Sequence, residues 1–237
     1  MYRIGPVEKA RHYIMAHSSD DDEDIEKSSA GPCITISREA GARADKISDL
    51  LINYFQKIND TSQWAVFDKN IIEKVLQDHN LPNTLRKLME EKKYPAMKSI
   101  MNEFLVGQPS VWSLAHKTTE TILQLASIGN VIILDRGANV ITAKLPNTFH
   151  VRLVAPIEDR IPHVQTLYNF DKAEAVEFIK REDADRKEYL MNYFHKDITD
   201  PLIYNLIINT GNLSDEECAE IIENAVIKKL GASLSIN

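Results

Sequence analysis

Basic and polar side chains follow the short apolar segments of this sequence, where strands of a parallel sheet would end. The groups are Ser37-Arg38-Glu39-Ala40-Gly41-Ala42-Arg43, Asp68-Lys69, Asp135-Arg136-Gly137-Ala138-Asn139 and Asn209-Thr210. Because the ligand site of an open parallel sheet lies beyond the carboxyl ends of its strands, we expect these groups to lie close together. Guanidinium groups match phosphate oxygens, and free amides at helix N-termini add partial positive charge. The pattern favours a site for phosphate-bearing ligands over isolated surface ion pairs.

Five apolar runs alternate with helical patterns, which predicts a layered α/β fold with a mostly parallel sheet. The runs lie at 33–37, 64–67, 131–134, 149–154 and 206–208. The most hydrophobic of them, 131–134, has the pattern of a central strand that is buried on both faces. Helices are expected at 7–17, around 47–55 and 71–76, at 111–127, from 156 onward, at about 171–194 and at 214–230.

The composition is typical of a globular protein and argues against several classes of partner. The 237 residues include 28 basic and 35 acidic ones, for a formal net charge of -7, which disfavours binding to nucleic acid. Five of the acidic residues lie at 20–24, in a Ser-rich stretch that we interpret as a linker. No apolar run approaches the ~18–20 residues that span a bilayer, and no signal peptide is apparent. We therefore expect a cytoplasmic protein without membrane contact.

Five segments resemble, in order, motifs of the cytidylate kinase-like family within the P-loop nucleoside monophosphate kinases. Residues 34–41 resemble the I-T-I-S-R-E-x-G segment that opens the family's domain. Residues 67–72 resemble its aromatic-D-K-x-x-I segment, and residues 131–139 resemble the V-I-V-G-R-G-A-N segment at the end of a strand. Residues 181–190 resemble its lid pattern, in which Asp-Arg follows an arginine at four and five residues. Residues 200–210 resemble its D-P-x-x-Y-D-L-V-I-N-T segment.

The resemblance implies a fold and a domain organisation. The fold would be the α/β P-loop NTPase fold of the nucleoside monophosphate kinase type, with a parallel five-stranded sheet of order 2-3-1-4-5. The kinase-like domain would cover 32–237, with a helical monophosphate-binding insertion at 70–127 and a lid at 171–200. Residues 1–31 would form a short helix and an acidic, flexible linker.

The resemblance also implies an activity, which is transfer of a phosphoryl group from ATP, with Mg²⁺, to a nucleoside monophosphate such as CMP or to a similar small acceptor. Such chemistry relies on positioning and charge neutralisation. The implied catalytic residues are Arg38, Arg43, Arg181, Asp185 and Arg186, and the implied acceptor-binding residues are Asp68, Lys69, Arg136 and Asn139. The implied ATP-binding residues are Gly41, Ala42, Ala44, Asp45, Lys46, Asn209 and Thr210. The resemblance assigns no side chain as a metal ligand. It is compatible with a homo-oligomer.

The loop after the first apolar run departs from the Walker A pattern, G-x-x-x-x-G-K-[ST]. Superposition of the two puts Arg43 at the second glycine, Ala44 at the lysine and Asp45 at the Ser/Thr. Arg43 would either obstruct the approach of phosphates to the backbone or supply the missing charge itself. Two other functions therefore stay open. One is a catalytically impaired pseudokinase that binds a nucleotide or anion for regulation or assembly, and the other is a scaffold that docks through residues 1–17.

Overall fold

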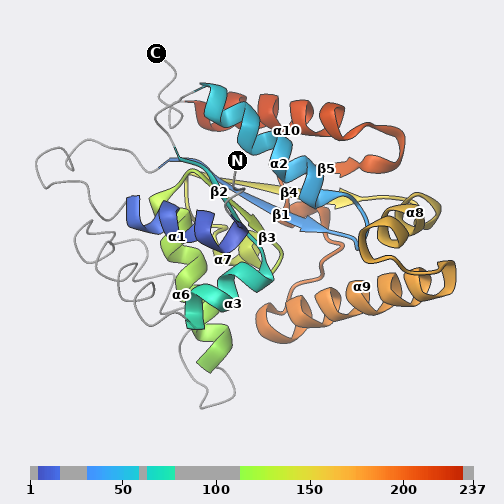
Figure 1. Cartoon of the computed structure of the whole chain (residues 1–237). Helices are drawn as coiled ribbons and strands as arrows, with labels where there is room; N and C mark the ends of the chain where they lie inside the picture. The colour runs from blue at the N-terminus through green and yellow to red at the C-terminus, as the bar shows by residue number, and fades with distance from the viewer. Residues whose placement is uncertain (1–4, 17–30, 59–62, 78–112, 232–237) are drawn as a thin grey trace, which may run out of the picture.

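A computed structural model describes residues 5–16, 31–58, 63–77 and 113–231 of the chain. Five parallel strands form one sheet in the order β2-β3-β1-β4-β5 (Figure 1). The strands are β1 (Cys33–Arg38), β2 (Ala65–Phe67), β3 (Val131–Leu134), β4 (Thr148–Val154) and β5 (Leu206–Asn209). Both the parallel pairing and the order 2-3-1-4-5 that the resemblance implies are confirmed.

Helices cover both faces of this sheet (Figure 1). On one face lie α2 (Ala44–Ile58) and α10 (Asp215–Leu230), side by side. On the other face lie α1 (Pro6–Ala16), α3 (Lys69–Gln77), α6 (Ser113–Ile128) and the short α7 (Ala138–Ile141). Beyond the carboxyl ends of the strands lie α8 (Ile157–Tyr168) and α9 (Lys172–Phe194), and short 3₁₀ turns, η1 (Pro201–Ile203) and η2 (Thr210–Asn212), flank β5.

The central strand β3 is buried on both faces, as its continuous apolar sequence predicts. Val131 and Ile133 belong to the hydrophobic cluster that contains α1, α3 and α6. Ile132 and Leu134 belong to the cluster that contains α2 and α10. Because successive side chains of a strand point to opposite faces, one four-residue run joins both halves of the core. The carboxyl end of β3 is thereby held firmly at the edge where its polar residues follow.

The N-terminal helix α1 packs against the body of the protein. Its buried residues are Ala10, Tyr13 and Ile14, which are the three that share one side of the predicted helix. The ring of Tyr13 meets Phe67 of β2 edge to face, with centroids 5.7 Å apart, and its hydroxyl donates to the carbonyl oxygen of Gly129. The acidic residues 20–24 lie outside the described residues.

The region of the predicted insertion is described only at its two ends, by α3 and α6. Residues 78–112 lie outside the described part of the chain, so their helical structure and their role stay predictions. Within the described part, no helix combines the length and apolar character needed to cross a bilayer.

One face of β4 carries buried polar side chains in place of apolar ones. His150 is buried there, with its Nδ1 2.8 Å from Oγ1 of Thr35 on β1 and its Nε2 3.4 Å from Oγ1 of Thr148. Burial, assisted by the positive charge of Lys229, lowers the pKa of His150 from 6.5 to about 4. The folded protein therefore holds this ring neutral across a pH range in which an unfolded chain would protonate it.

Because His150 is buried in its neutral form, we expect the folded protein to become less stable in acid. Below pH 6.5 the unfolded chain takes up a proton at His150, whereas the folded protein does so only near pH 4. The free energy of unfolding should therefore fall by about 3 kcal/mol between these pH values through this group, and the contribution should level off below pH 4. Urea unfolding at a series of pH values would measure it.

The matched variants for this measurement are His150→Gln and His12→Gln. His150→Gln should lose this part of the pH dependence. His12, which is exposed on α1, is the control, and its variant should keep the full pH dependence. Identical pH profiles for His150→Gln and the unchanged protein would contradict the prediction.

Candidate functional site

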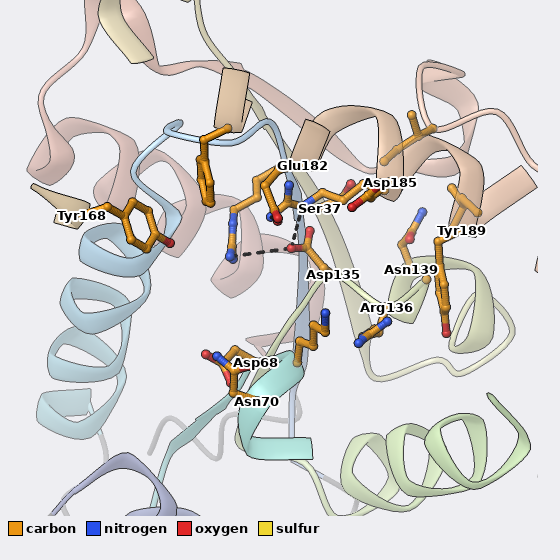
Figure 2. Close-up of a pocket in the computed structure, with 17 residues that line it drawn as sticks. Ser37, Asp68, Asn70, Asp135, Arg136, Asn139, Tyr168, Glu182, Asp185 and Tyr189 are labelled. Atoms are coloured by element: carbon orange, nitrogen blue, oxygen red, sulfur yellow. Dashed lines mark hydrogen bonds and ion pairs between the residues drawn. The ribbon is translucent and has the colours of Figure 1, made fainter. Parts of the chain in front are cut away.

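A cavity of about 450 Å³ opens at the carboxyl edge of the sheet, between the strand ends and α9. This volume is within the range of small-molecule sites. Figure 2 shows side chains converging on it from β1, the start of α3, the turn after β3, and α9. The cavity is lined by four cations and four carboxylates, which are Arg38, Lys69, Arg136 and Arg186 and, with opposite charge, Asp68, Asp135, Glu182 and Asp185.

Asp135 lies between two of these arginines (Figure 2). Its Oδ2 accepts a hydrogen bond of 3.0 Å from Nε of Arg186 and lies 3.7 Å from Nη2 of Arg38. Burial by itself would lower the pKa of Arg186, but the charges of Asp135 and Glu182 outweigh burial and raise the pKa. The Nη1 atoms of Arg38 and Arg186 are buried and have no hydrogen-bond partner among the described residues. These two guanidinium groups therefore have unused capacity for anionic oxygens.

The turn after β3 has an unusual backbone. Asp135, Arg136 and Gly137 have φ angles of 62°, 55° and 69°, so three successive residues adopt the left-handed conformation. This conformation is uncommon for residues other than glycine, and such strain concentrates at functional sites. A Cβ at Gly137 would lie 2.5 Å from the ring of Phe194, so glycine is also needed for α9 to pack against the turn. The turn thus directs two charged side chains into the cavity and supports the end of α9.

Arg136 connects the two sides of the cavity. Its Nη2 donates a hydrogen bond of 2.6 Å to Oε1 of Glu73 on α3. Its guanidinium lies 5.3 Å from the ring centroid of Tyr189 on α9. Burial raises the pKa of the Tyr189 hydroxyl, although the positive charge of Arg136 opposes this effect. Arg136 is therefore held by an acidic side chain and an aromatic face at the cavity wall.

A further arginine lies beneath the cavity. Arg152 of β4 is only 6% exposed and donates from Nη1 to Oγ of Ser37, 2.9 Å away, at the cavity lining. Its guanidinium also lies over the ring of Tyr204 at 5.7 Å, and the Tyr204 hydroxyl donates to the carbonyl oxygen of Ile198. A buried cation with hydroxyl partners adds positive potential on this side of the cavity.

The loop between β1 and α2 carries the residues that depart from the Walker A pattern. Arg43 has a φ of 60° and extends toward α10, where it donates to the carbonyl oxygens of Thr210 and Leu213 and pairs with Asp215 at 3.1 Å. Asp45 lies 3.4 Å from Nε2 of His163, and this hydrogen bond lowers the pKa of Asp45 despite partial burial. The Arg43 side chain therefore binds protein oxygens instead of filling the space of the missing lysine.

The structure brings together seven of the predicted site residues in the 450 Å³ cavity. They are Arg38, Asp68, Lys69, Arg136, Asn139, Asp185 and Arg186. Gly41, Arg43 and Thr210 line a separate, smaller cavity of about 210 Å³. Their proposed roles stay predictions, because a shared cavity shows proximity alone.

The other predicted site residues lie outside both cavities. Ala42 and Ala44 are buried in the core against α10, and Lys46 is exposed. The Asn209 side chain accepts a hydrogen bond from the Gly211 amide at the start of η2. Arg181 is exposed and lies 5.4 Å from the ring centroid of Phe178.

The sequence did not single out Glu73, it placed Asp135 in a strand-end group without a role of its own, and it favoured a packing role for Tyr189. Asp135 immediately precedes Arg136 at the end of an apolar run, so the signal that singled out Arg136 was present for Asp135 too. Glu73 and Tyr189 lie within helical patterns, where nothing local separates a cavity residue from an ordinary surface residue. Only the distances to Arg136 identify them.

Comparison with known proteins supplies a second line of evidence. A cytidylate kinase of Sulfolobus acidocaldarius is 32% identical over 80 residues, which are 33% of this chain and 43% of that protein. A uronate isomerase of Corynebacterium glutamicum is 27% identical over 116 residues, which are 49% of this chain and 22% of that protein. The chain thus spans less than half the length of either relative.

A solved structure and a family model match much more of the chain. The crystal structure of an uncharacterized protein from Eubacterium ventriosum has a TM-score of 0.63 at 18% identity and covers 83% of this chain and 98% of that one, which shows a shared fold. The model of the cytidylate kinase-like family matches residues 33–212, a range that contains all five strands and α9. The chain therefore belongs to the cytidylate kinase-like family, with the P-loop kinase fold that its sheet order displays.

Proposed function

We propose that this protein is an ATP-dependent phosphotransferase that moves a phosphoryl group to a nucleoside monophosphate or a similar small acceptor. The observation that carries the proposal is the convergence of three arginines and a lysine from separate elements on one cavity. Phosphoryl transfer needs positioned positive charge more than it needs a nucleophile or a base. Membership of the cytidylate kinase-like family supports a nucleotide kinase-like function of this general kind.

The acceptor would bind at the side of the cavity that Arg136 and α3 form. Arg136 offers a guanidinium for a phosphate, and Tyr168, Phe178 and Tyr189 add aromatic surface to the same lining. Every nucleobase has a π face that can stack on such rings. A cavity with cations and aromatic rings therefore suits a nucleoside monophosphate, for which CMP is the first candidate, better than it suits a small sugar phosphate.

The donor site fits the phosphates of ATP in part. The Ala40 amide points at an anionic oxygen, because it donates to the carboxylate of Asp183, and Gly41 has no side chain to block the loop. Ala44 and Asp45, however, supply neither the ammonium nor the hydroxyl of a Walker A loop. We propose that arginines outside the loop replace that charge. They are Arg38 and Arg186 at the cavity and Arg160 on α8, whose Nη1 lies 3.3 Å from the Ala40 carbonyl oxygen.

Magnesium would reach this site together with ATP. The described residues contain no group of three or more side chains able to hold a metal ion. Mg²⁺ keeps several waters and commonly binds through one or two carboxylates plus the substrate phosphates. The Asp185 carboxylate at the cavity lining suits that role. When bound, the ion would neutralise charge on the phosphates.

In the proposed mechanism the chain positions both substrates and stabilises charge in the transition state. Arg38 and Arg186 would hold the transferring group, and Asp135 would keep their guanidinium groups in place. Arg136 would bind the acceptor's phosphate with its charge only partly offset by Glu73. Closure of α9, the helix of the predicted lid, would exclude water from the cavity.

The first expected outcome is turnover. Purified protein with ATP, Mg²⁺ and a panel of nucleoside monophosphates should form ADP, and CMP should be among the acceptors. A coupled assay for ADP measures this. If the protein neither turns over nor binds ATP at millimolar nucleotide, the enzyme proposal is wrong.

The second expected outcome concerns individual arginines. Arg186→Ala should lower kcat/KM by about 10²–10³, the usual effect of removing one donor to transition-state charge. Arg136→Ala should raise the KM for the acceptor more than it lowers kcat. Arg11→Ala, which removes an exposed arginine on α1, is the control and should leave both constants unchanged. Equal kinetics for Arg186→Ala and Arg11→Ala would rule out the proposed role of Arg186.

The second candidate function is that of a pseudokinase that binds a nucleotide or anion without turnover. It is favoured by Ala44 and Asp45 in the loop and by the engagement of Arg43 with Thr210, Leu213 and Asp215. Calorimetry that detects tight ATP binding by a protein without turnover would support this function. Turnover that disappears in Arg136→Ala or Arg186→Ala would exclude it.

A further inference from the structure

The carboxylate of Asp183 on α9 binds the loop that the proposed function assigns to the donor's phosphates. Its Oδ1 accepts a hydrogen bond of 2.7 Å from the backbone amide of Ala40, and its Oδ2 accepts one of 2.6 Å from Nη1 of Arg160. Ala40 lies between β1 and α2, and Arg160 lies on α8. One carboxylate of α9 therefore contacts both α8 and the loop between β1 and α2.

The two donors that Asp183 binds are of the kinds that bind phosphate oxygens. Loop amides and guanidinium groups both form short, strong hydrogen bonds with anionic oxygens. A carboxylate presents two such oxygens, as one edge of a phosphate group does. We propose that Ala40 and Arg160 form an anion site, that Asp183 is its internal occupant, and that a phosphate group must displace Asp183 in order to bind there.

This anion site is part of the fold and does not depend on Asp183 alone. Arg160 is only 9% exposed, and its Nη1 also donates to the carbonyl oxygen of Ala40 at 3.3 Å. Gly41 has a φ of 85°, and a Cβ there would lie 2.8 Å from the Arg160 carbonyl oxygen, so the loop lies directly against α8. The loop amide and the guanidinium would thus stay close together after Asp183 had left.

Charge balance explains why Asp183 binds here and why a phosphate can replace it. A buried guanidinium needs an anionic partner, and Asp183 supplies one when no ligand is present. The Arg160 Nε makes no hydrogen bond among the described residues, although it lies 3.8 Å from Oε2 of Glu39, a second carboxylate, so it keeps a donor for a further oxygen. A phosphate brings more charge and an additional oxygen acceptor. It can therefore make the bonds that Asp183 makes and add others.

Displacement of Asp183 would couple phosphate binding to the position of α9. The same helix carries Glu182, Asp185 and Arg186 at the lining of the large cavity. While Asp183 is bound to the loop, these side chains are held in their present positions. Release of Asp183 would let α9 adjust around the donor, so binding at the loop would reorganise the cavity.

The test uses anion binding and lid exchange and does not depend on turnover. Inorganic tripolyphosphate is titrated by calorimetry into the full chain and into Asp183→Ala. The variant should bind about tenfold more tightly, because the anion no longer competes with a charge-assisted contact. Hydrogen–deuterium exchange of α9 should be faster in ligand-free Asp183→Ala than in the unchanged protein. Tripolyphosphate should also speed exchange of α9 in the unchanged protein.

Glu188→Gln is the matched control, because it removes one exposed negative charge from the same helix. Its tripolyphosphate affinity should equal that of the unchanged protein. Should Asp183→Ala fail to give a cooperative thermal transition, Asp183→Asn, of nearly the same shape, takes its place. Equal affinity, weaker binding by a folded Asp183 variant, or no binding by either protein would overturn the inference. Because none of these readouts involves turnover, an inactive protein that binds as expected would refute the proposed catalysis alone.

Discussion

Arginines that gather at one edge of a parallel sheet need negatively charged partners if the chain is to pack around them. In this protein four arginines of that edge are paired with a carboxylate from another element, whereas the buried Arg152 has the hydroxyl of Ser37 as a partner. Arg38 and Arg186 share Asp135, Arg136 pairs with Glu73, and Arg160 pairs with Asp183. The desolvation of such groups is costly, and it is tolerable because each charge finds a partner. The carboxyl edge of the sheet is thus close to neutral, while Nη1 of Arg38 and Nη1 of Arg186 have no hydrogen-bond partner among the described residues.

These ion pairs, together with apolar packing against α8, determine where α9 lies. Asp183 attaches the helix to the β1–α2 loop, Arg186 attaches it to the turn after β3, and Gly137 allows Phe194 to approach that turn closely. The contacts of Asp183 and Arg186 lie at the charged edge, whereas Phe194 also packs against the hydrophobic cluster that contains β3. A ligand that changes the charge balance at the edge would therefore change the contacts of α9 first. This is the physical basis on which a helix of the predicted lid can respond to an anion.

The altered phosphate loop fits the same pattern. Arg43 occupies a left-handed position and binds the oxygens of Thr210, Leu213 and Asp215, so it connects the loop to the segment before α10. A guanidinium used in this way orders the loop, and under the proposed function the binding of phosphates falls to arginines elsewhere.

The sequence by itself determined the strands and their parallel pairing, the family resemblance implied their order, and the residues after the strands indicated the edge at which polar side chains gather. A continuous apolar run is a local property of the sequence. The runs 131–134 and 33–37 therefore indicate buried strands whichever elements pack against them. It also identified Arg38, Arg136 and Arg186, because arginines after strand ends and within a lid pattern are visible in the chain. The tertiary structure alone decided which distant carboxylates meet these arginines, apart from the local pair of Arg186 with Glu182 on α9. Glu73 lies 63 residues from Arg136, and Asp183 lies 143 residues from Ala40. Such pairs depend on how whole helices cross the end of the sheet, and no local pattern encodes that geometry.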